Sequence, residues 1–380
     1  MIAVIADDLS GAAELAGAAA KFGLRAEVHT VFNARADAEL VAVDTDTRSL
    51  PAPEAARRVA EITRAIHAVQ PTWIYKKTDS VLRGHVRKEI EAILSVTGQT
   101  RALLIPANPS KQRIIRGGVY FVNGTPLAET SFARDPEHPR RSSRVAELLA
   151  LNSVEKTCVV PDATCAADLA SHAQDVDATT LTAGGVDFFQ ALLRTKLAAA
   201  AHDDRFAQAA RVESTHQFGA KPHTLFVCGS AAAWDNGCAE ECRAHQVPIV
   251  VMPEELFAGS GNLSAIRDWH DAVAKALHAH SGVMLAVGRG SHTRSPAVPR
   301  ELLARLIDAT VHALASQTVE RIFLEGGATA AALLQRMNWT RLDALATGLI
   351  GVAVLRPANG PLLFIKPGSY PWPTEVWPAV

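Results

Sequence analysis

The chain repeats one pattern: a short apolar run, a polar cluster directly after it, and then a helix. The first run, Ile2–Ala6, is too short for a helix and is followed by Asp7 and Asp8. The Ala-rich segment after these residues predicts a helix that ends at Gly23, a residue suited to a helix C-cap. Ala26–Val31 then has the pattern of a second strand. Strand, helix and strand in this order predict a parallel sheet with right-handed crossovers.

The same alternation continues to the end of the chain, with further apolar runs at Leu40–Val43, Trp73–Tyr75, Arg101–Ile105, Thr179–Thr182, Thr224–Val227, Gly282–Val287, Arg321–Leu324 and Pro361–Ile365. A chain of 380 residues has the length of two domains. Residues 198–222 are polar and lack strand character. We therefore predict an α/β protein with domains at 1–221 and 222–380. Each domain should contain a mostly parallel sheet flanked by helices, with the active site in the cleft between them.

One interruption of the pattern lies in the first half. Gly117–Val122 precedes Asn123 and Gly124, a pair that favours a tight hairpin turn. A long segment containing proline and arginine follows and continues through Arg144. We expect this segment to form a flap over the site.

The net charge and the lengths of the apolar runs limit the partners and the location that we expect for this chain. The net charge of −1 gives no indication of nucleic acid or of an anionic membrane surface as a partner. No apolar run approaches the roughly 20 residues that a membrane helix needs. The first residues resemble a strand rather than a signal peptide, so we expect a cytoplasmic protein. A homo-oligomer is compatible with the sequence, which does not fix the oligomeric state.

The five cysteines show no disulfide-framework spacing. Cys238 and Cys242 lie four residues apart with His245 nearby, a spacing that a metal site can use. A second pair of ligands is not apparent, however, so we expect buried free thiols and no metal centre built from protein side chains alone.

Polar clusters follow four successive strands of the first half. Their members are Asp7 and Asp8; Arg48 in the segment Asp44–Ser49; Lys77, Thr78, Asp79, Ser80 and Arg83; and Asn108. Each cluster alone is explained equally well as a solvated loop or a helix cap. Because the carboxyl ends of parallel strands meet at one edge of a sheet, the four together predict a polar pocket. Its cations, carboxylates and hydroxyls suit a carboxylate-bearing polyol.

Glycines follow several strands of the second half. Gly326 and Gly327 precede Ala328 and Thr329 at the start of a predicted helix, where backbone amides favour a phosphate. Ser230 and Gly368 also follow strands and could line the same nucleotide site. No Walker A loop is present, and a glycine pair before a helix is equally consistent with a tight structural turn.

The combination of several of these segments resembles the four-carbon acid sugar kinases. The segments are I-A-D-D-L-S-G-A at 5–12, D-T-D-T-R-S at 44–49, Y-K-K-T-D-S-V-L-R-G-H at 75–85 and I-P-A-N-P at 105–109. The second half adds G-S at 229–230, G-G-A-T-A at 326–330 and K-P-G-S at 366–369. The resemblance covers essentially the whole chain.

The resemblance implies an ATP-dependent kinase that phosphorylates the 4-hydroxyl of threonate, erythronate or an oxo-tetronate, with magnesium held by the ATP phosphates. Arg48 is then expected to pair with the substrate carboxylate, and Lys77 and Ser80 to bind its hydroxyls. Either Asp79 or Asp8 would accept the proton of the attacking hydroxyl. The implied nucleotide contacts are Ser230, Gly326, Gly327, Ala328, Thr329 and Gly368.

Two other classes remain open. A sugar-acid sensor without ATP chemistry would keep the first pocket, and Ala328 stands where the family usually has a carboxylate. A dehydrogenase or aldolase acting on the same acids is less consistent with the chain. The first strand is not followed by G-x-G-x-x-G, and Lys76 and Lys77 lie in polar surroundings unsuited to a Schiff base.

Overall fold

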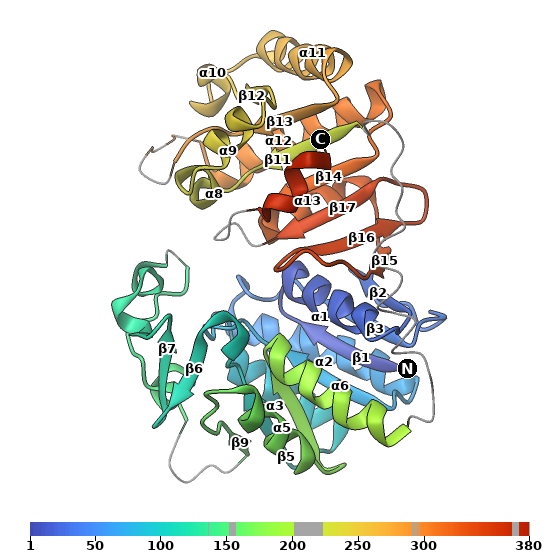
Figure 1. Cartoon of the computed structure of the whole chain (residues 1–380), viewed down its shortest axis with the longest axis vertical. Helices are drawn as coiled ribbons and strands as arrows, with labels where there is room; N and C mark the ends of the chain where they lie inside the picture. The colour runs from blue at the N-terminus through green and yellow to red at the C-terminus, as the bar shows by residue number, and fades with distance from the viewer. Residues whose placement is uncertain are drawn as a thin grey trace. The chain divides into compact units, whose positions relative to one another are not determined.

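The computed structural model describes residues 1–135, 137–151, 157–200, 223–290, 293, 295, 297–366 and 372–379. The chain divides into two compact units, residues 1–211 and 212–380. The predicted boundary between 221 and 222 lies outside the described residues. The expected α/β class is confirmed, since each unit contains a mostly parallel sheet with helices (Figure 1).

The first unit contains a seven-stranded parallel sheet in the order β2–β3–β1–β4–β10–β5–β9. Its strands are β1 (Ile2–Ala6), β2 (Ala26–His29), β3 (Leu40–Asp44), β4 (Trp73–Lys77), β5 (Arg101–Ile105), β9 (Cys158–Val159) and β10 (Thr180–Gly184). Successive strands are added on opposite sides of β1. Helix α1 leads from β1 to β2 on one side, whereas α2 leads from β3 past β1 to β4 on the other side. Position β1 is therefore a switch point, where open parallel sheets bind ligands at the carboxyl ends of their strands.

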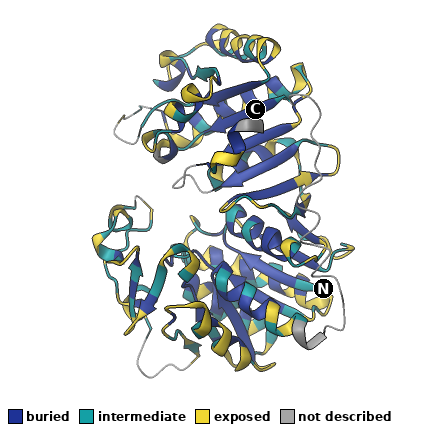
Figure 2. Ribbon diagram, viewed as in Figure 1, coloured by how far each residue is buried: buried dark blue, intermediate teal, exposed yellow. Residues whose placement is uncertain are grey.

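Helices cover both faces of this sheet. Their bounds are α1 (Leu9–Lys21), α2 (Ala52–Ala68), α3 (Val86–Thr97), α5 (Ala166–Gln174) and α6 (Val186–Ala200), with the short α4 at Val145–Leu148. Helix α6 packs against α1 and α5, and α2 packs against α3. Gly23, with φ 78°, follows the end of α1 as predicted from its C-cap role. The strands between these layers are buried over nearly their whole length (Figure 2).

The predicted hairpin belongs to a small antiparallel sheet of β6 (Arg113–Arg116), β7 (Val119–Val122) and β8 (Thr125–Pro126). Asn123 and Gly124 have φ of 51° and 80° and join β7 to β8, which confirms the tight turn. The 3₁₀ helices η2 (Leu127–Glu129) and η3 (Ser131–Arg134) follow it, and η1 (Pro109–Lys111) precedes it. We call residues 113–144 the flap.

The second unit contains a sheet in the order β12–β13–β11–β14–β17–β16–β15. Its strands are β11 (Thr224–Cys228), β12 (Ile249–Val251), β13 (Gly282–Ala286), β14 (Arg321–Glu325), β15 (Arg341–Leu345), β16 (Ala353–Pro357) and β17 (Leu362–Lys366). The first four and β17 pair in parallel, whereas β15 and β16 pair antiparallel and were not predicted.

The helices of the second unit are α8 (Ala231–Asp235), α9 (Cys238–Ala244), α10 (Glu254–Phe257), α11 (Leu263–Ala279), α12 (Pro299–Ser316) and α13 (Gly327–Met337), with η5 at Thr374–Ala379. Gly237, with φ 85°, separates α8 from α9. A helix residue has negative φ, so the left-handed conformation at Gly237 ends one helix and redirects the chain.

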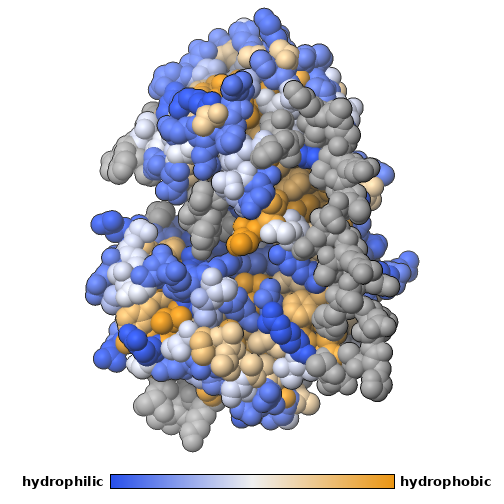
Figure 3. Space-filling model, viewed as in Figure 1, coloured by the Kyte–Doolittle hydropathy of each residue, from blue (hydrophilic) through white to orange (hydrophobic). Residues whose placement is uncertain are grey.

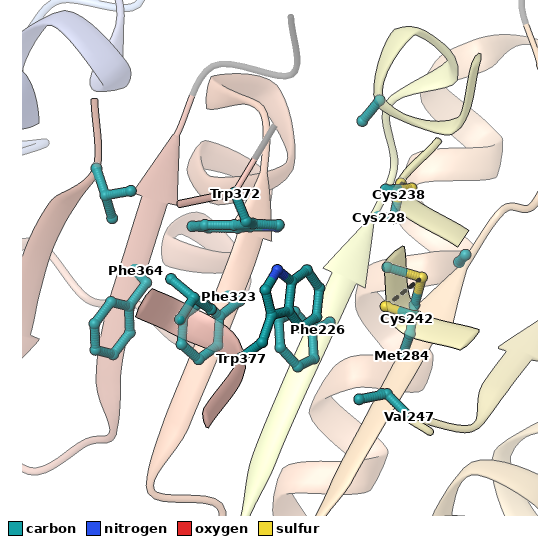
Figure 4. Close-up of a cluster of buried hydrophobic side chains, with 14 of the residues drawn as sticks. Phe226, Cys228, Cys238, Cys242, Val247, Met284, Phe323, Phe364, Trp372 and Trp377 are labelled. Atoms are coloured by element: carbon teal, nitrogen blue, oxygen red, sulfur yellow. Dashed lines mark hydrogen bonds between the residues drawn. The ribbon is translucent and has the colours of Figure 1, made fainter. Parts of the chain in front are cut away.

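One core of this unit consists mainly of aromatic and sulfur-containing side chains (Figure 4). Phe323 stacks between Phe226 and Phe364, with ring centroids 4.7 and 4.4 Å apart. Cys228, Cys238 and Cys242 are buried free thiols packed in the same core, as predicted. On the face shown in Figure 3, hydrophilic residues cover much of the surface. Within the described part of the chain, no helix is long and apolar enough to cross a membrane.

Candidate functional site

Three neighbouring strands of the first unit end side by side. Ala6 of β1 is in register with Asp44 of β3 and with Lys77 of β4. The residues that follow Ala6 and Lys77 are Asp7 and Thr78, so these polar residues leave the sheet together. Both are buried, with exposed fractions of 3% and 0%. A polar site buried at this edge must satisfy its own hydrogen bonds or those of a ligand.

Arg48 joins these strand ends. Its Nε donates to Oδ2 of Asp7 and its Nη1 to Oδ2 of Asp8, each at 2.8 Å. Asp79 Oδ1 lies 4.0 Å from the same Nη1. Burial opposes the charge on Arg48, but Asp7, Asp8 and Asp79 outweigh it and raise the pKa of Arg48 well above its ordinary value. The guanidinium is therefore a permanent cation that holds three carboxylates.

Asp8 is also the N-cap of α1. Its Oδ1 accepts the backbone N–H of Gly11 at 2.9 Å, and its Oδ2 accepts the hydroxyl of Ser10. Side-chain capping of this kind stabilises the first turn of a helix. The carboxylate of Asp8 thus caps the helix and contacts Arg48 at the same time, and the hydroxyl of Ser10 helps to orient it.

Asp79 is held from within its own turn. Oδ2 accepts the backbone N–H groups of Val81 and Arg83 at 3.0 and 3.1 Å, and Oδ1 accepts Nη2 of Arg83 at 2.8 Å. Burial opposes ionisation, but Arg83 and Arg48 outweigh it and hold the pKa of Asp79 far below its usual value. A carboxylate with these partners is a weak proton acceptor.

Lys77 lies beside the first turn of α1. Its Nζ donates to the carbonyl of Thr78 at 3.0 Å and lies 3.2 Å from Oε2 of Glu14. Lys111 contacts the other oxygen of Glu14 at 2.6 Å. Burial opposes the charge on Glu14, but the two lysines lower its pKa to about 2. A Cβ on Gly11 would lie 3.2 Å from Cγ of Lys77, so glycine is needed for this close approach.

A buried network lies behind Arg48. Nζ of Lys76 is 2.5 Å from Oε2 of Glu89, and both residues are at most 1% exposed. Oε1 of Glu89 accepts the hydroxyl of Thr47 at 2.7 Å, and Thr47 is hydrogen-bonded to Thr45. Thr45 in turn donates to the carbonyl of Ala6. This network fixes the segment that carries Arg48 against β1.

Two buried oxygens at the strand ends lack hydrogen bonds. Oδ1 of Asp7 and Oγ1 of Thr78 have no partner among the residues that the structure describes. Buried polar atoms without a partner are costly and are usually satisfied by water or a ligand. Their position next to Arg48 and Lys77 is what a ligand with hydroxyl groups requires.

The flap contacts the turn between β4 and α3. Arg113 donates to the hydroxyl of Ser80, and Nη1 of Arg83 lies 3.2 Å from Oδ2 of Asp135. His138 Nε2 lies 2.9 Å from the carbonyl oxygen of Arg48. The expectation that this segment covers the site is consistent with these contacts.

Asn108, which was predicted for the site, and His85 lie apart from this network. His85 is hydrogen-bonded through Nε2 to the carbonyl of Leu50. Oδ1 of Asn108 accepts the backbone N–H of Asp187 at 3.1 Å, and it packs where a Cβ on Gly185 would be. Asn108 therefore fixes the start of α6. In the described chain, the side chain of Asn108 forms no hydrogen bond with Arg48, Lys77 or Asp79.

The predicted nucleotide residues that are described also lie at neighbouring strand ends. Cys228 and Glu325, which precede Gly229 and Gly326, are in register on β11 and β14. Ser230 Oγ accepts the N–H of Ala233 at 3.2 Å and so caps α8. A Cβ on Gly229 would lie 2.7 Å from Oγ1 of Thr329.

Gly326 is the N-cap of α13 and has φ 93° and ψ 147°, a conformation that favours glycine. Having no side chain, it leaves the amides of the first turn, which includes Gly327, Ala328 and Thr329, without a capping oxygen. These amides suit a phosphate. Gly368 lies outside the described residues.

A buried ion pair lies at the strand ends that precede this turn. Glu325 and Lys366 are in register on β14 and β17, and their side chains form a buried ion pair. The backbone N–H of Gly326 also donates to the carbonyl of Lys366 at 2.9 Å. Glu325 and Lys366 also line a small cavity together with Trp372, Asn236 and Glu241.

Sequence reasoning missed several members of the first site. Glu14 lies three and six residues after Gly11 and Asp8 on one side of α1, a spacing that could have indicated it. Glu89 occupies the buried side of α3 with Val86, Ile90 and Ile93, where a carboxylate indicates a buried partner. Asp135 and Arg140 come from the flap, and no local pattern indicates them.

Family models match nearly the whole chain. Residues 2–233 match a model described as a sugar-binding N-terminal domain, and residues 225–370 match one described as a nucleotide-binding C-terminal domain. A 3-oxo-tetronate kinase of Methylobacterium radiotolerans is 27% identical over 414 residues, covering 96% of this chain and 95% of that protein.

Two other relatives match locally. A D-threonate kinase of Salmonella typhimurium is 36% identical over 153 residues, and a D-erythronate kinase of Heliobacterium modesticaldum is 34% identical over 171 residues. These matches cover 40% and 43% of this chain but only 36% and 38% of those proteins.

Solved structures share the fold. One from Salmonella typhimurium has a TM-score of 0.76 at 17% identity and covers 97% of this chain and 96% of its own. One from Haemophilus influenzae has a TM-score of 0.69 at 18% identity and covers 97% of both chains. At these identities the similarity concerns the fold alone.

Proposed function

Because the chain belongs to the four-carbon acid sugar kinase family, we propose that it transfers the γ-phosphoryl group of ATP to the 4-hydroxyl of a tetronate. The observation that carries this proposal is the pair of unsatisfied buried oxygens, Asp7 Oδ1 and Thr78 Oγ1, beside Arg48 and Lys77. Carboxylate and hydroxyl oxygens with nearby cations suit a small molecule that carries both hydroxyls and a negative charge.

In this proposal Asp8 accepts the proton of the attacking hydroxyl. Arg83 and Arg48 hold the pKa of Asp79 far below its usual value, which makes Asp79 the weaker of the two expected bases. The side chain of Asp8 is 20% exposed, against 7% for Asp79, and is thus the more accessible to a substrate. As the O–H proton moves to Asp8, the hydroxyl oxygen bonds to the γ-phosphorus, and the bond from that phosphorus to ADP breaks.

Lys77 supplies the positive charge near the acceptor. Its ammonium is held by Glu14 and by the carbonyl of Thr78, so it is oriented before the substrate arrives. Orientation of this kind lowers the cost of neutralising charge in the transition state. Ser80 and Thr78 are the hydroxyl-bearing residues of the same turn, and we assign them to the substrate hydroxyls.

The glycine turn of the second unit fits a phosphate. Gly326 leaves amides of α13 without a side-chain cap, and Gly229 allows Thr329 to approach the end of β11. In the described chain, no group of three His, Cys, Asp or Glu side chains could hold a metal ion alone. Magnesium bound with the nucleotide would be held mainly by phosphate oxygens and water, and the hydroxyl of Thr329 would be a candidate ligand from this turn. Bound there, it would neutralise phosphate charge.

The test is an ADP-release assay with ATP and each of D- and L-threonate, D- and L-erythronate and the 3-oxo-tetronates. We expect turnover with at least one acid. Asp8→Asn should lower kcat by about 100-fold or more, the contribution typical of a general base. Asp46→Asn, a change of an exposed aspartate in the neighbouring loop, should leave kcat nearly unchanged.

Two results would oppose the proposal. Full turnover by the Asp8→Asn variant would exclude Asp8 as the base. Tetronate binding by calorimetry without nucleotide binding or ADP release would instead support the sugar-acid sensor.

A further inference from the structure

Arg140 reaches from the flap to the turn between β4 and α3. Its Nη1 donates to the carbonyl of Leu82 at 2.7 Å, and its Nε donates to the carbonyl of His138 at 2.8 Å. The backbone N–H of Arg140 donates to the carbonyl of Phe132 at 2.9 Å. The guanidinium is thus fixed from both sides, although both acceptors are neutral.

Arg140 differs in this respect from Arg48 and Arg83. Arg48 contacts Asp7 and Asp8, and Arg83 contacts Asp79 and Asp135. No carboxylate among the described residues lies within ion-pair distance of Arg140. A guanidinium has five N–H donors, of which the two carbonyls use two.

The surroundings of Arg140 disfavour an unpaired cation. The side chain is half-buried, and burial lowers its pKa, with the neighbouring charge of Arg83 acting in the same direction. Asp79 and Asp135 act on it only at longer range. Keeping a cation in such a place is costly unless an anion pairs with it.

We infer that Arg140 binds the carboxylate of the sugar acid and so selects the acid over the uncharged polyol. This inference rests on the proposed function and assigns one part of the substrate to one residue. Free N–H groups in a fixed plane match a carboxylate bidentately, which a lysine cannot do. The charge of Arg48, which the sequence suggested for this role, is already balanced by the carboxylates of Asp7 and Asp8.

The experiment compares Arg140→Gln with Arg141→Gln, a change of the exposed arginine next in the chain. Calorimetry measures binding of D-erythronate and of erythritol, which carries a hydroxymethyl group in place of the carboxylate. We expect Arg140→Gln to weaken erythronate binding by about 30-fold or more, in the range of a lost charge-assisted pair. Erythritol binding should change less than about twofold, and Arg141→Gln should match the unmodified chain for both ligands.

Arg140→Lys provides a second measurement in case Arg140→Gln does not fold, as judged by circular dichroism. It keeps the charge without the planar fork, so we expect erythronate binding between those of the unmodified chain and Arg140→Gln. Equal erythronate affinity in the Arg140 variants and Arg141→Gln would overturn the inference. An equal loss for erythronate and erythritol would do so as well, because it indicates a general disturbance of the pocket.

The two proposals fail in different ways. Erythronate binding that depends on Arg140, without ADP release, would leave this inference standing and overturn the kinase. ADP release that is insensitive to Arg140 would do the reverse. A chain that neither binds nor turns over any tetronate would overturn both.

Discussion

Nε of Arg48 donates a hydrogen bond to Oδ2 of Asp7 at 2.8 Å, joining the segment after β3 to the end of β1. The side chain of Asp7 is only 4% exposed, so Arg48 compensates part of the solvation that the buried carboxylate has lost. Arg48, which the sequence suggested as a substrate ligand, is thus the counter-ion of carboxylates within the protein itself.

Arg48→Gln should therefore lower the free energy of unfolding as well as activity. Removing one partner of a buried pair leaves an uncompensated charge and costs about 3–5 kcal/mol. Urea unfolding near neutral pH measures this loss. The matched control is Arg57→Gln, which removes an exposed pair with Glu61 and should cost no more than about 0.5 kcal/mol. Similar losses in both variants would contradict the prediction.

Asp44 should make stability depend on pH. Burial, reinforced by the charge of Asp8, raises the pKa of Asp44 to about 8 from 3.8. Between these values the folded chain binds a proton that the unfolded chain releases, so the free energy of unfolding falls as pH rises through this window. The effect is about 6 kcal/mol at most, because each pKa unit corresponds to about 1.4 kcal/mol.

Asp44→Asn removes the titrating group, and the variant should lack this decline between about pH 4 and about pH 8. Urea unfolding of both chains at several pH values measures the difference. If the two stability curves run parallel across this range, Asp44 ionises normally in the folded chain.

Gly11→Ala should damage the acceptor site. The added Cβ would lie 2.8 Å from Oδ1 of Asp8 and 3.2 Å from Cγ of Lys77, so at least one of these side chains must move. We expect kcat/KM to fall by about tenfold or more, since a small displacement of positioned groups is costly.

Gly17→Ala is the control in the same helix, because a Cβ there meets no atom within 4 Å. It should raise the free energy of unfolding by about 0.5–1 kcal/mol through helix propensity, without changing kcat/KM. Steady-state kinetics and urea unfolding of both variants test the pair. A Gly11→Ala variant as active as Gly17→Ala would show that the close packing of Asp8 and Lys77 against Gly11 does not affect catalysis.

Gly326→Ala should weaken nucleotide binding. With φ 93° and ψ 147°, the position lies in a region that costs a side-chain-bearing residue about 1–3 kcal/mol. If the turn relaxes to avoid this strain, ATP affinity should fall by about tenfold, while tetronate affinity stays the same. Gly348→Ala, at an exposed position where a Cβ meets nothing, should change neither affinity. Calorimetry with ATP and with tetronate would disprove the prediction if ATP affinity were retained.

Local patterns in the sequence predicted much of the parallel framework. A buried parallel strand needs a run of apolar residues whatever its neighbours are, so β1, β3 and β14 could be recognised within about one residue of their ends. The antiparallel strands β15 and β16 were missed. β15 alternates exposed and buried residues, with Asp343 between Leu342 and Ala344, a weaker pattern than an apolar run.

In the candidate site too, some features could be predicted from the sequence and others only from the folded structure. The sequence alone determined which residues follow the strands, and parallel pairing then brings Asp7, Arg48 and Lys77 to one edge. Which partner each charge takes was decided only by the tertiary structure, because ion pairs form between residues distant in the chain. Arg48 bonds Asp7 across 41 positions, and Arg140 reaches Leu82 across 58. No local pattern contains such distances, so the lack of a carboxylate partner for Arg140 among the described residues could be recognised only in the folded chain.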